Sequence, residues 1–215
     1  MFHKRSAQTE AISIVLISGI VIALVGVAYI WGVPLLQKRS ASTDFSLATN
    51  FIQELDQRIV SLANLGSGKE TLHIPKGALR VVPDGTNSKD NNSLTLEFAI
   101  DQPLIFGNGS TILGGAYADV GQDVGVRGES EPCVIILTSR PIQSAHAVSL
   151  TLHCRELKTT EDPPRSFKIS ITNPDNTTKI GENQVTLTVA KTELIPGGGN
   201  GGADLLLTEI LADVG

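Results

Sequence analysis

Hydrophobic and polar residues fall into three successive patterns along the chain. Residues 11–36 are uncharged and almost entirely apolar, whereas residues 44–65 place an apolar side chain at every third or fourth position. Most of the remainder alternates apolar and polar residues in short runs. A spacing of three to four is typical of a helix, and a spacing of two is typical of a half-buried strand. The chain is therefore expected to be α+β, a long N-terminal hydrophobic helix followed by an antiparallel β-sandwich-like domain.

The uncharged segment is long enough to cross a membrane. At about 1.5 Å of rise per residue it exceeds the roughly 30 Å of a hydrocarbon core. Lys4 and Arg5 precede it, and they favour a cytoplasmic start with the rest of the chain outside. This apolar core is too long for an ordinary cleaved secretory signal, which has roughly 7 to 15 apolar residues.

Small residues and one proline interrupt the uncharged segment. Gly19 and Gly26 lie seven residues apart among large aliphatic side chains. Small residues allow helices to approach closely in lipid, so these two are candidates for an assembly surface, although a solitary span is equally compatible with them. Pro34 lacks a backbone N–H and is expected to kink or interrupt the helix before its amphipathic continuation over residues 37–66.

The β-rich part is expected to form the domain at residues 67–196. Clear alternation predicts strands at residues 94–100, 167–171 and 185–189, and less regular strands at 72–74, 78–82 and 111–113. A glycine-rich stretch at residues 197–202 is expected to be a spacer to an apolar tail, the whole covering residues 197–215. That tail either folds back on its own domain or reaches a neighbouring subunit.

Two cysteines are expected to face each other across a hairpin. The runs 133–137 and 148–154 are related by a centre between Gln143 and Ser144, which pairs Cys133 with Cys154. The exported side of a membrane permits a disulfide between them. The alternative is two buried thiols that behave as small hydrophobic residues.

Composition narrows the function classes. The net charge is −5, and no dense cationic run lies outside the flanks of the apolar segment, which disfavours nucleic acid as a partner. The sequence has no nucleophile elbow, phosphate loop or metal-ligand spacing, so we expect neither an enzyme nor a cofactor or metal site. Three glycosylation sequons begin at Asn91, Asn108 and Asn176.

The residues before the apolar segment carry a more specific pattern. Basic residues come first, then small ones, then polar ones ending in a carboxylate: Lys4, Arg5, Ser6, Ala7, Gln8, Thr9 and Glu10. This pattern resembles the class III signal peptide of archaeal type IV pilins and archaellins. The resemblance implies that residues 1–7 are removed by a cut after Ala7, which leaves the apolar helix, residues 8–36, on the mature protein. A basic residue usually stands directly before the small one at the cut, so cleavage after Arg5 or Ser6 stays open.

The resemblance also implies a function. It predicts a pilin, the structural subunit of an extracellular filament at the cell surface that serves adhesion or motility, held in the cytoplasmic membrane before assembly. Its partners would be copies of itself, a prepilin-type signal peptidase, an assembly ATPase and a membrane platform protein. Glu10 would pair with the amino terminus of a neighbouring subunit, or else would simply favour the positive end of its helix. The alternative is a single-span surface protein whose β domain binds a ligand or another cell without polymerising.

Overall fold

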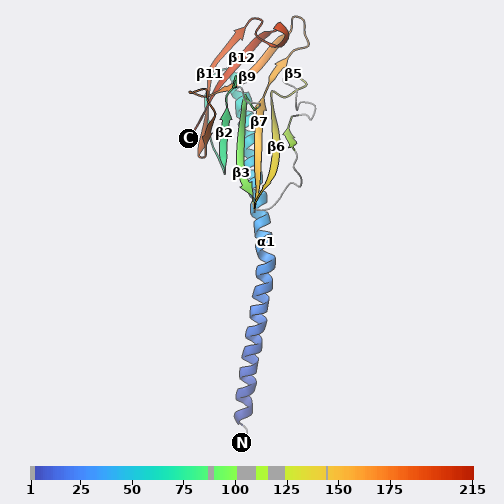
Figure 1. Cartoon of the computed structure of the whole chain (residues 1–215), viewed down its shortest axis with the longest axis vertical. Helices are drawn as coiled ribbons and strands as arrows, with labels where there is room; N and C mark the ends of the chain where they lie inside the picture. Colours follow the sequence, from blue (N-terminus) through green and yellow to red (C-terminus); the bar gives the residue numbers. More distant parts are fainter. Residues whose placement is uncertain (1–2, 87–89, 101–109, 116–123, 144) are drawn as a thin grey trace.

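The computed structural model describes residues 3–86, 90–100, 110–115, 124–143 and 145–215, with side chains described from Ser13 onward. One helix, α1 (His3–Leu65), leads into a domain of two β-sheets (Figure 1). The lower half of α1 projects from the domain as a rod, and its upper half runs into the domain. The predicted α+β class, a long apolar helix before a mostly antiparallel sandwich-like domain, is confirmed.

Helix α1 passes through Pro34 without ending there. Of the two outcomes expected at Pro34, a kink or an interruption, the interruption does not occur. Proline removes one backbone donor, and the turns on either side keep their own hydrogen bonds. The helix instead ends where the sequence places glycine: Gly66 has a φ of 68°, and its N–H donates to the Leu62 carbonyl oxygen at 2.9 Å. This left-handed residue is a common way to close a helix.

The first sheet has six strands among the described residues. All of its neighbours are antiparallel except the pairs β12–β9 and β8–β5. In spatial order its strands are β1 (Lys69–His73), β11 (Gln184–Ile195), β12 (Asp204–Val214), β9 (Arg165–Thr172), β8 (Glu156–Lys158) and β5 (Val124–Val126).

The second sheet also has six strands in the described part of the chain, and all of them pair antiparallel. In spatial order they are β10 (Lys179–Gly181), β2 (Ala78–Val82), β3 (Ser93–Ile100), β7 (Ala145–Cys154), β6 (Cys133–Ile142) and β4 (Ser110–Gly114). The strands expected at residues 78–82 and 94–100 are therefore present.

The C-terminal tail belongs to the first sheet. Residues 197–202, which the sequence suggested as a flexible spacer, form the connection of the β11–β12 hairpin and include a short 3-10 turn, Asn200–Gly202. Strand β12 then lies between β11 and β9. Of the two alternatives for the tail, the structure shows that it folds back on its own domain, because Leu205, Ile210 and Ala212 are buried there.

The upper half of α1 supplies one wall of the hydrophobic core. Its buried side chains, among them Ile52, Leu55 and Ile59, join one cluster with residues from both sheets. Ion pairs between Lys76 and Asp44 and between Arg58 and Glu70 connect the helix to the first strands of the domain. The rod is therefore held to the domain along several helical turns.

Candidate functional site

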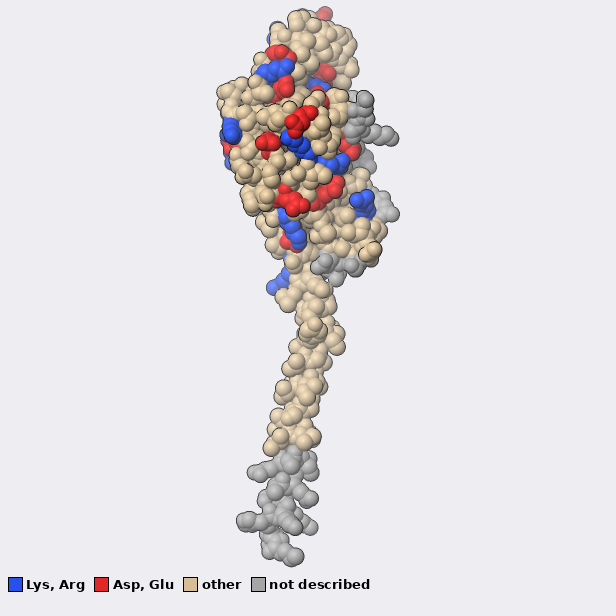
Figure 2. All heavy atoms as spheres, turned by 60° about the vertical axis from the view of Figure 1, so that its left-hand side comes forward, with Lys and Arg blue, Asp and Glu red and all other residues tan. Residues whose placement is uncertain are grey.

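The lower half of α1 is a bare apolar surface. Between Ser13 and Leu36 its large hydrophobic side chains, apart from the half-buried Val33, are exposed around the helix, for example Ile22 at 72% and Trp31 at 79%. Figure 2 shows charged side chains gathered on the domain and at its junction with the rod. In the described part of the chain, α1 is the one helix long and apolar enough to cross a membrane, as judged by length and composition. Such a surface requires lipid or apolar protein around it.

The small residues of this rod lie open to any neighbour. A Cβ atom added at Gly19 or Gly26 meets nothing within 4 Å outside the helix itself. Seven residues are close to two full turns, so these glycines share one face, and Ala23 lies between them on that face. The face is a shallow stripe against which another helix can pack closely.

The residues predicted for processing and pairing lie at the start of α1. Arg5, Ser6, Ala7, Gln8 and Glu10 have helical backbone. Their side chains lie outside the described part of the structure, so the proposed cut and the pairing of Glu10 stay predictions.

The predicted hairpin and its disulfide are present. Cys133 and Cys154 are bonded, and the register pairs Ile135 with Leu152 and Leu137 with Leu150, as the sequence indicated. Both cysteines are buried in the main core cluster. The alternative of two free thiols does not hold.

The sequons occupy different surroundings. Asn176 is exposed in a turn that Asn173 closes by accepting a hydrogen bond from the Thr177 N–H. Asn91 is half-buried, and Ser93, the third residue of its sequon, is fully buried. Asn108 lies outside the described residues. Of the two sequons in the described residues, Asn176 is therefore the one that the folded surface presents openly.

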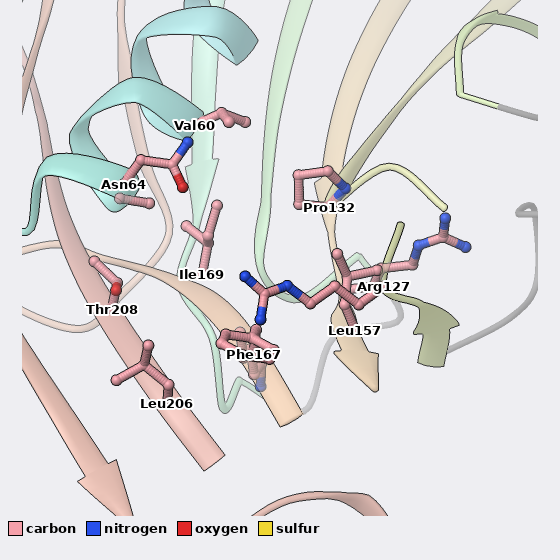
Figure 3. A pocket seen from close by; sticks show the side chains of 12 residues that line it. Val60, Asn64, Arg127, Pro132, Leu157, Phe167, Ile169, Leu206 and Thr208 are labelled. Carbon is pink, nitrogen blue, oxygen red and sulfur yellow. The ribbon is translucent and has the colours of Figure 1, made fainter. Parts of the chain in front are cut away.

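A cavity of about 240 Å³ lies where the upper end of α1 meets the first sheet (Figure 3). Val60 and Asn64 reach it from the helix, and Phe167 and Leu206 reach it from strands β9 and β12. The Arg127 guanidinium lies over the Phe167 ring, 3.8 Å from its centre. Sequence reasoning missed this cavity because its walls come from elements far apart in the chain.

Next to this cavity a carboxylate of α1 is held in an unfavourable environment. Asp56 lies one turn before Val60; burial, and secondarily the negative charge of Glu131, raise the pKa of Asp56 to about 6. Its Oδ1 atom is buried without a hydrogen-bond partner among the described residues. Burial without a compensating partner favours the neutral acid.

No three His, Cys, Asp or Glu side chains in the described residues form a group that could hold a metal ion.

Comparisons of the chain with protein-family models, with curated proteins and with solved structures gave no match.

Proposed function

We propose that this chain is a structural subunit of a type IV pilus-like extracellular filament, in which the lower halves of many α1 helices form an apolar core. One observation carries the proposal: the apolar rod is uncovered and is continuous with a helix built into the core of the domain. A rod of this kind presents its domain at a fixed angle, which a repeating assembly requires.

The small-residue stripe supports packing of helix on helix. Moving an apolar helix from lipid into a bundle of like helices changes little hydrophobic free energy, so close packing must supply much of the attraction. Gly19, Ala23 and Gly26 provide a face where backbones can approach. The disulfide suits an exported domain, because such bonds persist in oxidising compartments.

The N-terminal pattern supports the route to the filament. In this proposal a prepilin-type peptidase removes residues 1–7, and Glu10 pairs with the new amino terminus of a neighbouring subunit. An unpaired carboxylate beside a lipid-embedded helix is costly, so that pairing favours assembly over the free membrane form. An assembly ATPase and a membrane platform protein insert subunits, and the finished filament serves adhesion or motility.

Electron microscopy and N-terminal sequencing of the surface fraction of expressing cells test the proposal. We expect filaments whose subunits begin at Ser6, Ala7 or Gln8. Subunits that keep Met1 and stay dispersed in the membrane would contradict the proposal and favour the single-span anchor.

Two variants separate assembly from anchoring. Gly26→Leu keeps the rod apolar but fills the stripe, so we expect a protein that still enters the membrane and forms few filaments. Ala28→Leu is the matched control, because Ala28 points about 200° away from Gly26 around the helix. Filament yields that are equally normal for both variants would argue against the stripe as the packing face.

A third variant addresses charge pairing. Glu10→Ala is expected to reduce filament yield while leaving the membrane level of the protein unchanged. Glu54→Ala is its control, since Glu54 is an exposed carboxylate on the same helix whose partner is Arg58. Normal filaments from Glu10→Ala would remove the proposed role of this carboxylate.

A further inference from the structure

The cavity at the upper end of α1 has an apolar wall that the helix leaves uncovered. Helix α1 ends at Leu65, and a Cβ atom at Gly66 would lie 3.7 Å from the Thr192 hydroxyl of β11. Beyond this point the hairpin of β11 and β12 continues, with Leu194 paired to Leu206. Paired residues share a face, and Leu206 lines the cavity. Leu206 is 36% exposed, and its strand partner Leu194, which lies outside the lining of the cavity, is 61% exposed. The β12 side of the cavity is therefore apolar and partly open.

The opposite side of the cavity is cationic. Arg127, Arg155 and Lys168 line it, and no carboxylate is among its described lining residues. Lys168 forms an ion pair with Asp84, and Arg155 donates from Nε and Nη2 to the Glu131 carbonyl oxygen. Arg127 differs from both, because in the described part of the chain its guanidinium makes no ion pair and only stacks on Phe167. The guanidinium N–H donors of Arg127 are therefore available to a ligand.

Arg127 is held in place before any ligand arrives. The backbone N–H of Arg127 donates to the Lys158 carbonyl oxygen at 2.9 Å. The turn that follows is closed by the backbone N–H of Ser130, which donates to the Val126 carbonyl oxygen at 2.8 Å. The ring of Phe167 supports the guanidinium from one side (Figure 3). A preorganised side chain loses less entropy when it binds.

These features select a ligand class. A planar guanidinium offers paired N–H donors that match a carboxylate. One guanidinium with open N–H donors provides two parallel hydrogen bonds, which suits the two oxygens of a carboxylate monoanion. The cavity volume of about 240 Å³ lies below the range of about 300–1,000 Å³ typical of drug-sized ligands, so the ligand is small.

We propose that this cavity binds a small monocarboxylic acid with an aromatic or branched apolar body. The carboxylate lies on Arg127, and the body packs between Ala63 of the helix and Leu206 of β12. The proposal is independent of filament formation, since every residue in it belongs to one chain.

Titration calorimetry on the full chain in lipid nanodiscs tests the proposal, with empty nanodiscs as the blank. The probes are phenylacetate and its neutral isostere phenylacetamide. We expect phenylacetate to bind. The amide should bind more weakly by a factor of about ten or more, because a hydrogen bond to a charged group is lost. Equal affinity for the two probes, or no heat above that of empty nanodiscs, overturns the proposal.

Three variants locate the binding. Arg127→Gln is expected to weaken phenylacetate binding about tenfold or more, with little effect on the amide. Arg140→Gln is the control, since Arg140 is an exposed arginine of β6 outside this cavity. Ala63→Leu fills the apolar side without changing charge and is expected to weaken both probes, which keeps the test decisive if Arg127→Gln does not fold. Phenylacetate binding unchanged by both Arg127→Gln and Ala63→Leu would place the ligand elsewhere and overturn the proposal.

Discussion

The side-chain amide of Asn92 donates a hydrogen bond of 2.8 Å to the carbonyl oxygen of Ile169 and thereby joins the two sheets. Asn92 directly precedes β3 of the second sheet, whereas Ile169 lies in β9 of the first. The same amide donates to the Cys154 carbonyl oxygen, and Asn92 Oδ1 accepts from the Ile171 N–H, each at 2.8 Å. Asn92 is buried, and one side chain thus satisfies three backbone groups at the junction of β3, β7 and β9.

Replacing Asn92 should destabilise the domain strongly. Asn92→Ala leaves two carbonyls and one N–H buried without partners, so we expect a loss of about 3 kcal/mol in the free energy of unfolding. Pulse proteolysis in urea on the full chain in detergent micelles measures it. Asn92 has a φ of 55°, so alanine at this position adds backbone strain to the loss of the hydrogen bonds. Asn92→Gly separates these two causes, because glycine tolerates this backbone conformation but also loses the hydrogen bonds. If Asn92→Gly were as stable as the wild type, the hydrogen bonds would not be the cause.

The elements whose signals are local could be predicted from the sequence. The register of the β6–β7 hairpin follows from two apolar runs placed symmetrically about one turn, which pairs Cys133 with Cys154. Strand β2 matches its predicted bounds, and the end of α1 follows from Gly66. In each case the deciding residues lie within 21 positions of one another in the chain.

The features that depend on distant contacts could not be predicted. Asn92 occurs within a sequon, and nothing near it in the chain indicates partners 62 and 77 residues away. Arg127 follows a strand of three residues that pairs in parallel with β8, too short for any periodicity to show. The glycine-rich stretch at residues 197–202 has the composition of a spacer, whereas pairing of the flanking strands makes it a hairpin connection.

Reducing the disulfide should lower stability without abolishing the hairpin. The bond closes a loop with a sequence separation of 21, for which the chain-entropy model gives roughly 3 kcal/mol. We expect a reductant to lower the urea midpoint of the wild type. The double variant Cys133→Ala, Cys154→Ala should have a similarly lowered midpoint that no longer responds to the reductant. A wild-type midpoint insensitive to complete reduction would show that the bond adds nothing to stability.

The raised pKa of Asp56 gives a pH dependence of defined sign. Its pKa is about 6 in the folded chain against an ordinary value of 3.8, so between these values the folded state holds the proton more tightly than the unfolded state. This contribution to stability is present below about pH 4 and is lost as the pH rises through about 6. The free energy of unfolding of Asp56→Asn, taken relative to that of the wild type, should therefore be higher at pH 7.5 than at pH 4.5.

Unfolding measured at both pH values tests this sign. Glu182→Gln, a change at an exposed carboxylate of the domain, is the control for general effects of charge removal. A difference between Asp56→Asn and the wild type that stays constant with pH would contradict the role of Asp56.

Gly77 lies in the connection before β2, at a position that has no room for a side chain. Its φ is 90°, and a Cβ atom there would lie 2.2 Å from the Glu97 carbonyl oxygen and 2.8 Å from the Phe98 Cβ. Gly77→Ala must therefore displace backbone at the start of β2, and we expect a loss of about 3 kcal/mol or more in the free energy of unfolding.

Gly85→Ala is the matched control, because Gly85 has a similar φ of 80° but open space where its Cβ would lie, as far as the structure is described. Its cost should be that of the backbone conformation alone, about 1 kcal/mol. Equal losses for the two variants, measured by pulse proteolysis, would mean that the close approach of Glu97 contributes nothing.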